Sequence, residues 1–371
     1  MIPALLNLAE ELASRHEVHV FAADGPSGPG RYQRAGASVY QLGGTADLAE
    51  RPVRARRLSR LGRFLRSLVG EICRVHAEGP FDLLHAFWAL DTALAATVLG
   101  RGLRVPVVVS VGGGEAVWMP AIAYGGAGSL AGRARLNTSL RLAHAITAGS
   151  AFAIQYLPAF ARTRAHVIPL GVRCETFDAT PERPPGPPWR LLQIADLNRV
   201  KDQEMLLRAF QRVVDRLGDV SLDCIGEDTL NGALRSRANE LGIGSCVRFH
   251  GFLPQRMLPE FYRRAHLHLV SSRYESQGVA ILEAAAAGLP TVGTAVGLAP
   301  TLHPLAARCV APGDAVALAE ATSALLLDET ARRAVGAAAR QWAHDHDARW
   351  TGREFERVYA SLLKRSARRR P

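Results

Sequence analysis

The stretch Ser271-Ser-Arg-Tyr-Glu-Ser-Gln-Gly-Val-Ala-Ile-Leu-Glu-Ala-Ala-Ala-Ala-Gly-Leu-Pro290 decides the fold of this chain. The strand-like run 266–270 leads into it, and after Glu275 the apolar residues recur at helical spacing. A Gly-Leu-Pro sequence ends this helix, and the next strand begins directly after it. We therefore expect Glu275 on a loop at the carboxyl end of a strand and Glu283 on the helix that follows.

This position favours a ligand site. Open α/β sheets bind ligands at the carboxyl ends of their parallel strands. The N-terminus of the following helix offers free backbone N–H groups and the positive end of a dipole to an anion. Two carboxylates beside such an anion site, Glu275 and Glu283, suit a ligand that carries both hydroxyls and a phosphate.

The composition is that of a protein with sizeable cores. The chain has 371 residues, enough for two domains of ordinary size, and 48% of them are hydrophobic. It contains no run of about 18 consecutive apolar residues, so we expect no membrane-spanning helix, and its first residues do not follow the signal-peptide pattern. The five cysteines are scattered, which favours a reducing, cytoplasmic location over a disulfide framework or a zinc cluster.

The positive charge is carried almost entirely by arginine. The net charge is +11, and of the 45 basic residues only Lys201 and Lys364 are lysine. Lys364 lies in a basic tail, whereas Lys201 lies in a loop after an apolar strand, where we expect a compact ammonium group to be required. A basic chain favours anionic partners. Nucleic acid is not an expected partner, because only 6% of the residues are aromatic and no nucleic-acid-binding signature occurs.

Strand-like runs alternate with helical stretches along the chain, which predicts parallel α/β units. The runs lie at residues 18–21, 83–84, 107–111, 145–147, 167–168, 191–194, 221–225, 247–249, 266–270 and 291–292. The proline-rich segment 179–188 separates two sets of them. We expect an N-terminal Rossmann-like domain (1–175), a linker (176–188), a C-terminal Rossmann-like domain (189–345), and a helix that crosses back to the first domain, with a basic tail (346–371).

Four landmarks follow one another in the second half of the chain. They are Ile194-Ala-Asp-Leu-Asn-Arg-Val-Lys-Asp-Gln203, Cys224-Ile-Gly-Glu-Asp228, Val247-Arg-Phe-His-Gly-Phe-Leu253 and the stretch with the two glutamates. In this order they resemble the retaining glycosyltransferases of family 4, also called glycosyl transferases group 1. The resemblance covers residues 165–345 closely and 5–165 more loosely. It implies the GT-B fold, in which two Rossmann-like, doubly wound domains face a central cleft.

The resemblance also implies roles for single residues. Glu275 would hold the hydroxyls of a donor sugar, together with the backbone amides of Ser276, Gln277 and Gly278. Glu283 would accept hydrogen bonds from the ribose of the nucleotide.

The diphosphate of the leaving nucleotide would be neutralised by Lys201, aided by the backbone amides of Val279 and Ala280. Its departure builds negative charge, so fixed positive groups at this point lower the barrier. The nucleotide pocket would include Gly226, and its base would be lined by Gly251, Phe252 and Leu253.

The expected function is therefore retaining transfer of a hexose from a UDP- or GDP-linked donor to a hydroxyl acceptor in glycan biosynthesis. The acceptor would be a saccharide, a lipid-linked sugar or a small molecule. In this family the attacking hydroxyl enters on the face that the nucleotide leaves, so neither a carboxylate nucleophile nor a metal or other cofactor is expected. Two alternatives stay open: a GT-B protein that binds a nucleotide sugar without turnover, and a sugar-nucleotide epimerase or phosphorylase on the same fold.

Two departures from the family pattern concern the diphosphate. The usual Gly-Arg-Leu before the lysine is Ala-Asp-Leu here, so Asp196 stands where an arginine normally binds phosphate. Arg199 is the expected substitute, and the alternative is that it is an ordinary loop arginine facing solvent.

A glycine-rich loop, Gly112-Gly-Gly-Glu115, follows the strand at 107–111. Relatives carry a histidine where Gly112 stands. We expect Gly113 and Glu115 to contact the acceptor or the sugar; a tight turn is the alternative. His85 is equally consistent with a functional and a structural role, and Ser150 is best interpreted as a helix N-cap.

Arg51–Ser67 is a basic amphipathic stretch. Such a stretch can contact an anionic membrane surface, which would make the protein peripheral at the inner face of the membrane. The alternative, which we favour, is that its apolar stripe packs on the domain.

The front of the chain also departs from the family. Relatives begin with a strand and a glycine-rich loop, whereas this sequence begins inside a predicted helix, 1–16. We expect an N-terminal domain without its first strand, because either the start lies upstream or this is a decayed copy. A sheet without that strand should leave unpaired edges.

Overall fold

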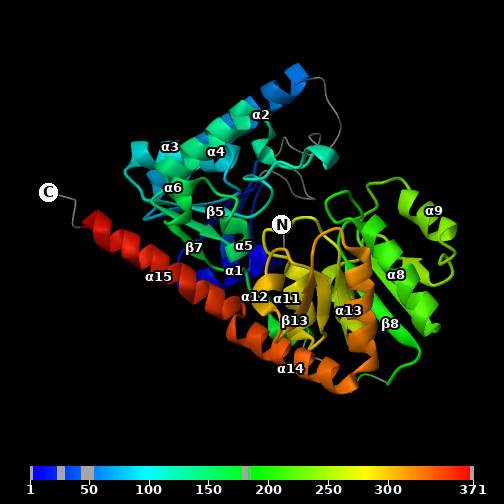
Figure 1. Ribbon diagram of the computed structural model, residues 1–371. Helices are drawn as coiled ribbons and strands as arrows, with labels where there is room; N and C mark the ends of the chain where they lie inside the picture. Colours follow the sequence, from blue (N-terminus) through cyan, green and yellow to red (C-terminus); the bar gives the residue numbers. More distant parts are fainter. Residues whose placement is uncertain (1–2, 23–29, 43–53, 178–182, 184, 368–371) are drawn as a thin grey trace.

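The computed structural model describes residues 3–22, 30–42, 54–177, 183 and 185–367, without the side chains of 54–61 and 366–367. Two α/β domains lie side by side, and the last helix runs from the second domain back along the first (Figure 1).

The C-terminal domain is built around one parallel sheet in the order β10-β9-β8-β11-β12-β13. Its strands are β8 (Trp189–Ile194), β9 (Val220–Ile225), β10 (Val247–Phe249), β11 (Leu267–Val270), β12 (Thr291–Thr294) and β13 (Ala307–Val310). Its helices are α8 (Gln203–Leu217), α9 (Ala233–Glu240), α10 (Leu258–Arg264), α11 (Val279–Ala286), α12 (Ala299–Leu302), α13 (Ala315–Leu327) and α14 (Glu329–Asp345). Separate apolar clusters cover the two faces of the sheet, so its central strands are buried on both sides.

The described strands of the N-terminal domain form two sheets, β1-β3-β2 and β4-β5-β6-β7. The strands are β1 (His19–Ala22), β2 (Gly30–Arg34), β3 (Ala37–Gln41), β4 (Leu84–Phe87), β5 (Val107–Val111), β6 (Ala145–Ala148) and β7 (Ala165–Val167). Only β2 runs antiparallel to its neighbour. The helices are α1 (Pro3–Ala13), α2 (Arg54–Glu78), α3 (Asp91–Leu103), α4 (Leu130–Leu142), α5 (Ala151–Ile154) and α6 (Ala159–Arg162).

β1 and β4 are end strands, and no strand of the described residues pairs with their outer edges. Both contribute to the same packing, because Phe21 of β1 packs on the apolar cluster that contains Leu84 of β4. The expectation of a further strand ahead of residue 1 stays a prediction.

Two segments join the domains. α7 (Cys174–Phe177) inserts Cys174 and Phe177 into the core of the C-terminal domain, where Arg183 also donates to the carbonyls of Ala287 and Gly288. Most of the predicted linker, residues 178–182 and 184, lies outside the described residues. α15 (Ala348–Ala367) then packs its Phe355 against α1 and its Leu362 against the sheet of β5 and β6.

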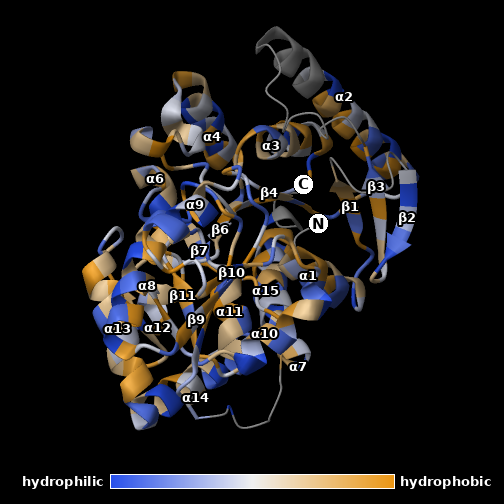
Figure 2. Cartoon of the chain, turned by 90° about the vertical axis from the view of Figure 1, so that its right-hand side faces the viewer, coloured by the Kyte–Doolittle hydropathy of each residue, from blue (hydrophilic) through white to orange (hydrophobic). Residues whose placement is uncertain are grey.

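The basic stretch Arg51–Ser67 falls largely within α2, and residues 51–53 lie outside the described part. From Phe64 onward the apolar stripe of α2 is buried in the N-terminal core, with Leu68, Ile72 and Val75. Figure 2 shows the polar face of α2 on the outside of the domain. None of the described helices is long and apolar enough to cross a bilayer. Peripheral contact with a membrane stays a prediction.

Candidate active site

A cavity of about 480 Å³ lies between the two domains, at the carboxyl ends of strands from both. Its lining includes Phe87, Trp88, Ser110, Gly112, Thr147, Gly149, Gln193, Asp196, Lys201, Glu275, Ser276, Gln277, Gly278, Val279, Ala280 and Glu283. The strand order of the C-terminal sheet reverses between β8 and β11. Open α/β sheets bind ligands at this kind of switch point, so the cavity lies where the fold predicts a ligand.

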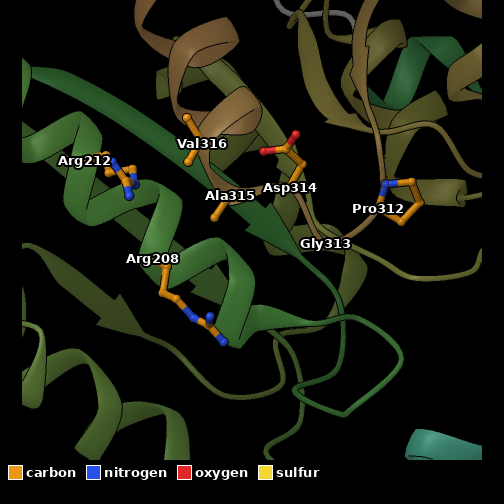
Figure 3. Close-up of a pocket in the computed structure, with 7 residues that line it drawn as sticks. All are labelled: Arg208, Arg212, Pro312, Gly313, Asp314, Ala315 and Val316. Atoms are coloured by element: carbon orange, nitrogen blue, oxygen red, sulfur yellow. The ribbon is translucent and has the colours of Figure 1, made fainter.

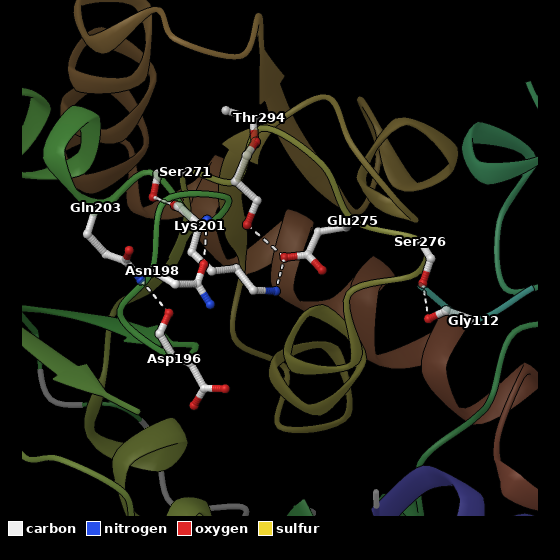
Figure 4. Close-up of polar contacts among 10 residues, drawn as sticks. Gly112, Asp196, Asn198, Lys201, Gln203, Ser271, Glu275, Ser276 and Thr294 are labelled. Carbon is white, nitrogen blue, oxygen red and sulfur yellow. Dashed lines mark hydrogen bonds and ion pairs between the residues drawn. The ribbon is translucent and has the colours of Figure 1, made fainter. Parts of the chain in front are cut away.

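Lys201 and Glu275 meet across the switch point (Figure 4). Lys201 follows β8, Glu275 follows β11, and the lysine Nζ lies 2.5 Å from the glutamate Oε1. Ser272 donates its hydroxyl to the same oxygen at 2.7 Å. The two side chains are 23% and 14% exposed, so the ion pair is partly shielded from water and still open to the cavity.

The loops that carry this pair are bonded to each other. Ser271 Oγ donates to the carbonyl of Lys201 at 2.7 Å, and Arg273 Nε donates to Asp202 Oδ2 at 2.8 Å. The amide of Lys201 donates to Asn198 Oδ1 at 3.1 Å. These hydrogen bonds fix the two loops, and with them the Lys201 ammonium and the Glu275 carboxylate, relative to each other.

The N-terminus of α11 opens on the cavity. Gly278 precedes the helix with a φ of +87°, which favours glycine, and Val279 and Ala280 form the first turn. The first amides of a helix have no partner within it, and they carry the positive end of the dipole. The binding of an anion by these amides stays a prediction.

The side chains of Ser276 and Gln277 contact the N-terminal domain. Ser276 Oγ donates to the carbonyl of Gly112 at 2.6 Å. The amide of Gln277 accepts from the N–H of Leu170 at 2.7 Å and donates to its carbonyl at 2.8 Å. The predicted role of these two residues is to bind the donor sugar through their backbone N–H groups. The contacts described here involve only their side chains and leave that prediction untested.

Glu283 lies deep in the cavity wall on α11, with 5% exposure. It accepts hydrogen bonds from Tyr262 Oη at 2.8 Å and from Gln255 Nε2 at 3.2 Å. Burial raises the pKa of its carboxyl above the ordinary value, although the two hydrogen bonds oppose the shift. The carboxylate is therefore held in the wall by two hydrogen bonds, and its binding of ribose hydroxyls stays a prediction.

Asp196 and Arg199 differ in their relation to the cavity. Asp196 lines the cavity, and its Oδ1 accepts from the amide of Glu227 at 3.2 Å. Its backbone carbonyl accepts from Gln203 Nε2 at 3.0 Å (Figure 4). Arg199 is exposed and is not among the lining residues. The hydrogen bond from the Glu227 amide connects the Asp196 carboxylate to the loop that follows β9. The carboxylate therefore has a partner within the protein.

Gly226, expected in the nucleotide pocket, and Gly251, Phe252 and Leu253, expected around the base, are not among the residues that line the cavity. Gly226 donates its N–H to the carbonyl of Gly251 at 3.0 Å, and a Cβ at Gly226 would come within 2.1 Å of the Ala195 carbonyl oxygen. Gly226 therefore allows two loops to approach closely. Phe252 is 74% exposed, whereas Leu253 packs on the C-terminal core.

Glu115 stabilises the glycine-rich loop by accepting hydrogen bonds from its backbone amides. Its Oε1 accepts from the amides of Ala89 at 3.1 Å and Gly112 at 3.2 Å, and its Oε2 accepts from the amide of Gly113 at 2.7 Å. Glu115 is 5% exposed and is not among the lining residues. In this structure Glu115 therefore stabilises the loop and does not face the cavity. Of residues 112–115, only Gly112 lines the cavity.

Two hydroxyls on the N-terminal wall of the cavity, those of Ser110 and Thr147, were not predicted from the sequence. Ser110 Oγ and Thr147 Oγ1 lie 2.5 Å apart, and His85 Nε2 lies 2.7 Å from Ser110 Oγ. His85 belongs to β4, and its Nδ1 lies 2.7 Å from Tyr359 Oη on α15. Burial lowers the pKa of His85 to about 3, so its ring is neutral. The signal in the sequence is position, because both hydroxyls are next to last in their strands.

Ser150 has two partners. Its Oγ accepts from the amide of Ala153 at 3.1 Å, so it caps α5, and it donates to the carbonyl of Ser276 at 2.5 Å. The predicted N-cap is confirmed, and the contact across the domain boundary was not predicted.

A second hollow, of about 550 Å³, lies outside the interdomain region, between α8 and the turn before α13 (Figure 3). Its lining is Arg208, Arg212 and residues 312–316, and Asp314 in that turn caps α13. It lacks the converging carboxylates and hydroxyls of the interdomain cavity. Among the described residues no group of three or more His, Cys, Asp or Glu side chains could hold a metal ion.

Two family models match the chain. The model for glycosyl transferases group 1 matches residues 176–342, which carry Lys201 and both glutamates of the site. The model for a glycosyl transferase 4-like domain matches residues 1–171. Together the matches account for both domains.

Curated relatives match over part of their length. The chain is 31% identical over 179 residues to the GDP-mannose-dependent alpha-(1-6)-phosphatidylinositol monomannoside mannosyltransferase of Mycolicibacterium smegmatis, covering 45% of this chain and 46% of the relative. It is 30% identical over 244 residues to D-inositol 3-phosphate glycosyltransferase 1 of Catenulispora acidiphila, covering 60% of this chain and 58% of the relative. The matched part thus spans about half the length of these relatives.

Solved structures share the fold over nearly the whole chain. The sucrose-phosphate synthase of Thermosynechococcus elongatus superposes with a TM-score of 0.76 at 21% identity, covering 96% of this chain and 92% of that one. HepE of Anabaena, solved with UDP-glucose, superposes with a TM-score of 0.74 at 18% identity, covering 96% and 95%. These likenesses show the two-domain fold. The chain belongs to the glycosyl transferases group 1 family, of the family-4 type with the GT-B fold.

Proposed function

We propose that this protein is a retaining glycosyltransferase that moves a hexose from a UDP- or GDP-linked donor to a hydroxyl acceptor. The observation that carries the proposal is the Lys201–Glu275 pair, which lies at the switch point of the C-terminal sheet, beside the N-terminus of α11. The cavity combines acceptors for hydroxyls with positive groups for a diphosphate.

The residues divide the work by charge. Lys201 and the first amides of α11 stabilise the negative charge that develops as the diphosphate leaves. Glu275 binds sugar hydroxyls, and Glu283 binds the ribose. The neutral hydroxyls of Ser110 and Thr147 on the opposite wall bind the acceptor.

No catalytic metal is part of the proposal, because the ammonium and the helix N-terminus supply the positive charge. Turnover is then expected to persist in excess EDTA. A loss of turnover in EDTA that added Mg²⁺ or Mn²⁺ restores would contradict this part of the proposal.

Named relatives support the class of donor and acceptor. The mannosyltransferase of M. smegmatis is named as GDP-mannose-dependent and as acting on a phosphatidylinositol monomannoside, and HepE was solved with UDP-glucose. The donor nucleotide is therefore to be sought among UDP and GDP, and the acceptor among saccharides and lipid-linked sugars.

The experiment is a panel of UDP- and GDP-sugars, each with and without hydroxyl acceptors. Nucleotide release is measured, and the anomeric configuration of the product is read by NMR. Release that requires an acceptor and retains configuration supports the proposal. Tight binding without release would favour a binding protein, and interconversion of sugars without an acceptor would favour an epimerase.

A further inference from the structure

The loop that carries Glu275 is bonded to the N-terminal domain on both sides of the glutamate. Tyr274 Oη donates to the carbonyl of Gly113 at 3.1 Å. Ser276 Oγ donates to the carbonyl of Gly112 at 2.6 Å, a contact drawn in Figure 4. Both carbonyls belong to the glycine-rich loop of the other domain. The position of Glu275 is therefore set by its own domain, through Lys201, and by the facing domain, through its two neighbours.

One peptide group connects this contact to Glu115. The amide of Gly113 and the carbonyl of Gly112 belong to the same trans peptide, so they point in opposite directions. The Gly113 N–H donates to Glu115 Oε2 at 2.7 Å, which turns the Gly112 carbonyl toward Ser276. The chain of contacts runs from Glu115 through one peptide plane to Ser276 and the backbone beside Glu275.

The charge on Glu115 strengthens this chain. A carboxylate that accepts from backbone amides makes charge-assisted hydrogen bonds, and a peptide polarised at its N–H becomes a better acceptor at its carbonyl. Glu115 also accepts from the amides of Ala89 and Gly112, so its orientation is fixed by three donors. It is 5% exposed, and it does not line the cavity.

The contact between the Glu275 loop and the N-terminal domain is surrounded by close packing. Tyr274 is 2% exposed and packs with Val117 of one domain and Val200 of the other. Gly149 leaves no room for a Cβ, which would come within 2.5 Å of Gln277 Oε1. The two domains are therefore in close contact beside Glu275, and the Ser276–Gly112 hydrogen bond itself lies at the cavity surface.

We propose that Glu115 is a positioning residue that sets the place of Glu275 across the domain boundary, through the Gly112–Gly113 peptide and Ser276. The inference rests on the proposed function, because it assigns Glu275 to the donor sugar. It makes the assembled domain interface a condition for turnover, since Glu275 is held from both sides only when the two loops meet.

The test is a double-mutant cycle with Glu115→Gln, Ser276→Ala and the double variant. Gly112 and Gly113 donate to different oxygens of Glu115, and a glutamine replaces one of these oxygens with an NH₂ group, so one of the two hydrogen bonds is lost. We expect each single variant to lower kcat by about 10- to 100-fold, on the scale that small misplacements of reacting groups produce. We expect the double variant to be little worse than the single ones, because both act through one path. Affinity for the free nucleotide should not change.

The control is Glu71→Gln, which removes an ion pair with Arg74 within α2 of the same domain. It should lower Tm and leave kcat unchanged. Additive losses in the cycle, or a loss of kcat no larger than the control shows at equal Tm, would overturn the inference.

Hydrogen exchange keeps the inference separable from the proposed function. In Glu115→Gln the segment 272–279 should exchange faster than in the wild-type protein, even with no substrate present. Unchanged exchange there would reject the role of Glu115. A wild-type protein that releases no nucleotide from any donor would reject the proposed function and leave the exchange result to decide on the coupling.

Discussion

The six strands of the C-terminal domain form one parallel sheet with apolar clusters on both faces, whereas the seven described strands of the N-terminal domain divide into sheets of three and four. Every residue of β2 is exposed, while every residue of β11 and of β12 is buried. The small sheet is held mainly by the packing of β1 and β3, which makes it the less cooperative part of the fold.

The difference is reflected in the site. The titratable groups of the cavity that suit a nucleotide sugar, Lys201, Glu275 and Glu283, all lie on loops and a helix that follow strands of the continuous C-terminal sheet. The N-terminal wall contributes neutral hydroxyls and backbone carbonyls. Groups that must be placed accurately are thus carried by the half whose sheet is continuous and covered on both faces, and the other half supplies the surface that completes the site.

The largest expected effect comes from Lys201→Met. Removing the ammonium leaves the diphosphate charge without its side-chain partner, so we expect kcat to fall by about 10²- to 10³-fold, the range for loss of one preorganised charge-stabilising group. Release of nucleotide from the preferred donor measures it. Lys364→Met is the matched control, because it alters the other lysine of the chain, which lies near the end of α15.

A fall in kcat of the same size in Ser110→Ala or Thr147→Val would contradict this difference between the domains. It would mean that the neutral hydroxyls of the N-terminal wall contribute as much to turnover as Lys201 does. We expect these two variants to raise KM for the acceptor and to change kcat by less than about tenfold, as expected for the loss of neutral hydrogen bonds.

The second effect concerns the stability of the two halves. Amides of β1 and β2, in which no residue is fully buried, should exchange with solvent at least about 100-fold faster than those of β8 and β11. Elements with little burial open at lower free energy. Hydrogen exchange followed by mass spectrometry measures this strand by strand. Equal protection in both sheets would mean that the divided domain unfolds only with the rest of the molecule.

Much of this fold could be predicted from the sequence where burial leaves a pattern. Each predicted apolar run overlaps a strand, and Glu275 and Glu283 lie on the loop and helix that were expected. β2, β3 and β13 were missed. β2 is a short polar edge strand with no buried face, and β13 has only Ala307 fully buried, so neither produces a clear period.

The site was predictable where residues share a sheet edge and unpredictable where the domains meet. Lys201 and Glu275 follow strands that the topology makes neighbours. The bonds from Tyr274 and Ser276 to the glycine-rich loop depend on how two separately folded domains dock, and no local pattern encodes this. Glu115 was expected to face a ligand, and the structure turns it toward three amides that a single sequence does not reveal.

The third effect tests how α15 holds the divided domain. In Tyr359→Phe the Nδ1 atom of the neutral His85 ring loses its partner. An unsatisfied buried polar group costs about 1–3 kcal/mol, so Tm should fall by a few degrees. Thermal unfolding measures this, with Tyr156→Phe at an exposed tyrosine as the control. An unchanged Tm would show that apolar packing through Phe355 and Leu362 suffices to hold the helix.

The smallest effect is expected at Glu283, and it distinguishes stability from function in the C-terminal half. Burial raises the pKa of this carboxyl in the folded protein, so the folded state holds the proton more tightly than the unfolded state. The ionised carboxyl therefore costs stability as pH rises through the unfolded pKa, and the cost is complete above the folded pKa. Glu283→Gln removes the charge while its amide oxygen still accepts from Tyr262 and a flipped Gln255 takes its NH₂ group.

Glu283→Gln should accordingly raise Tm by a few degrees near neutral pH, and the gain should shrink toward about pH 4, where a free glutamate is protonated. The same variant should bind the donor nucleotide more weakly, because an amide accepts fewer hydrogen bonds than a carboxylate. Glu320→Gln, at an exposed glutamate of α13, is the control. A gain in Tm that does not depend on pH would show that the substitution acts through packing, and a loss of Tm at neutral pH would show that the hydrogen bonds to the carboxylate outweigh its desolvation.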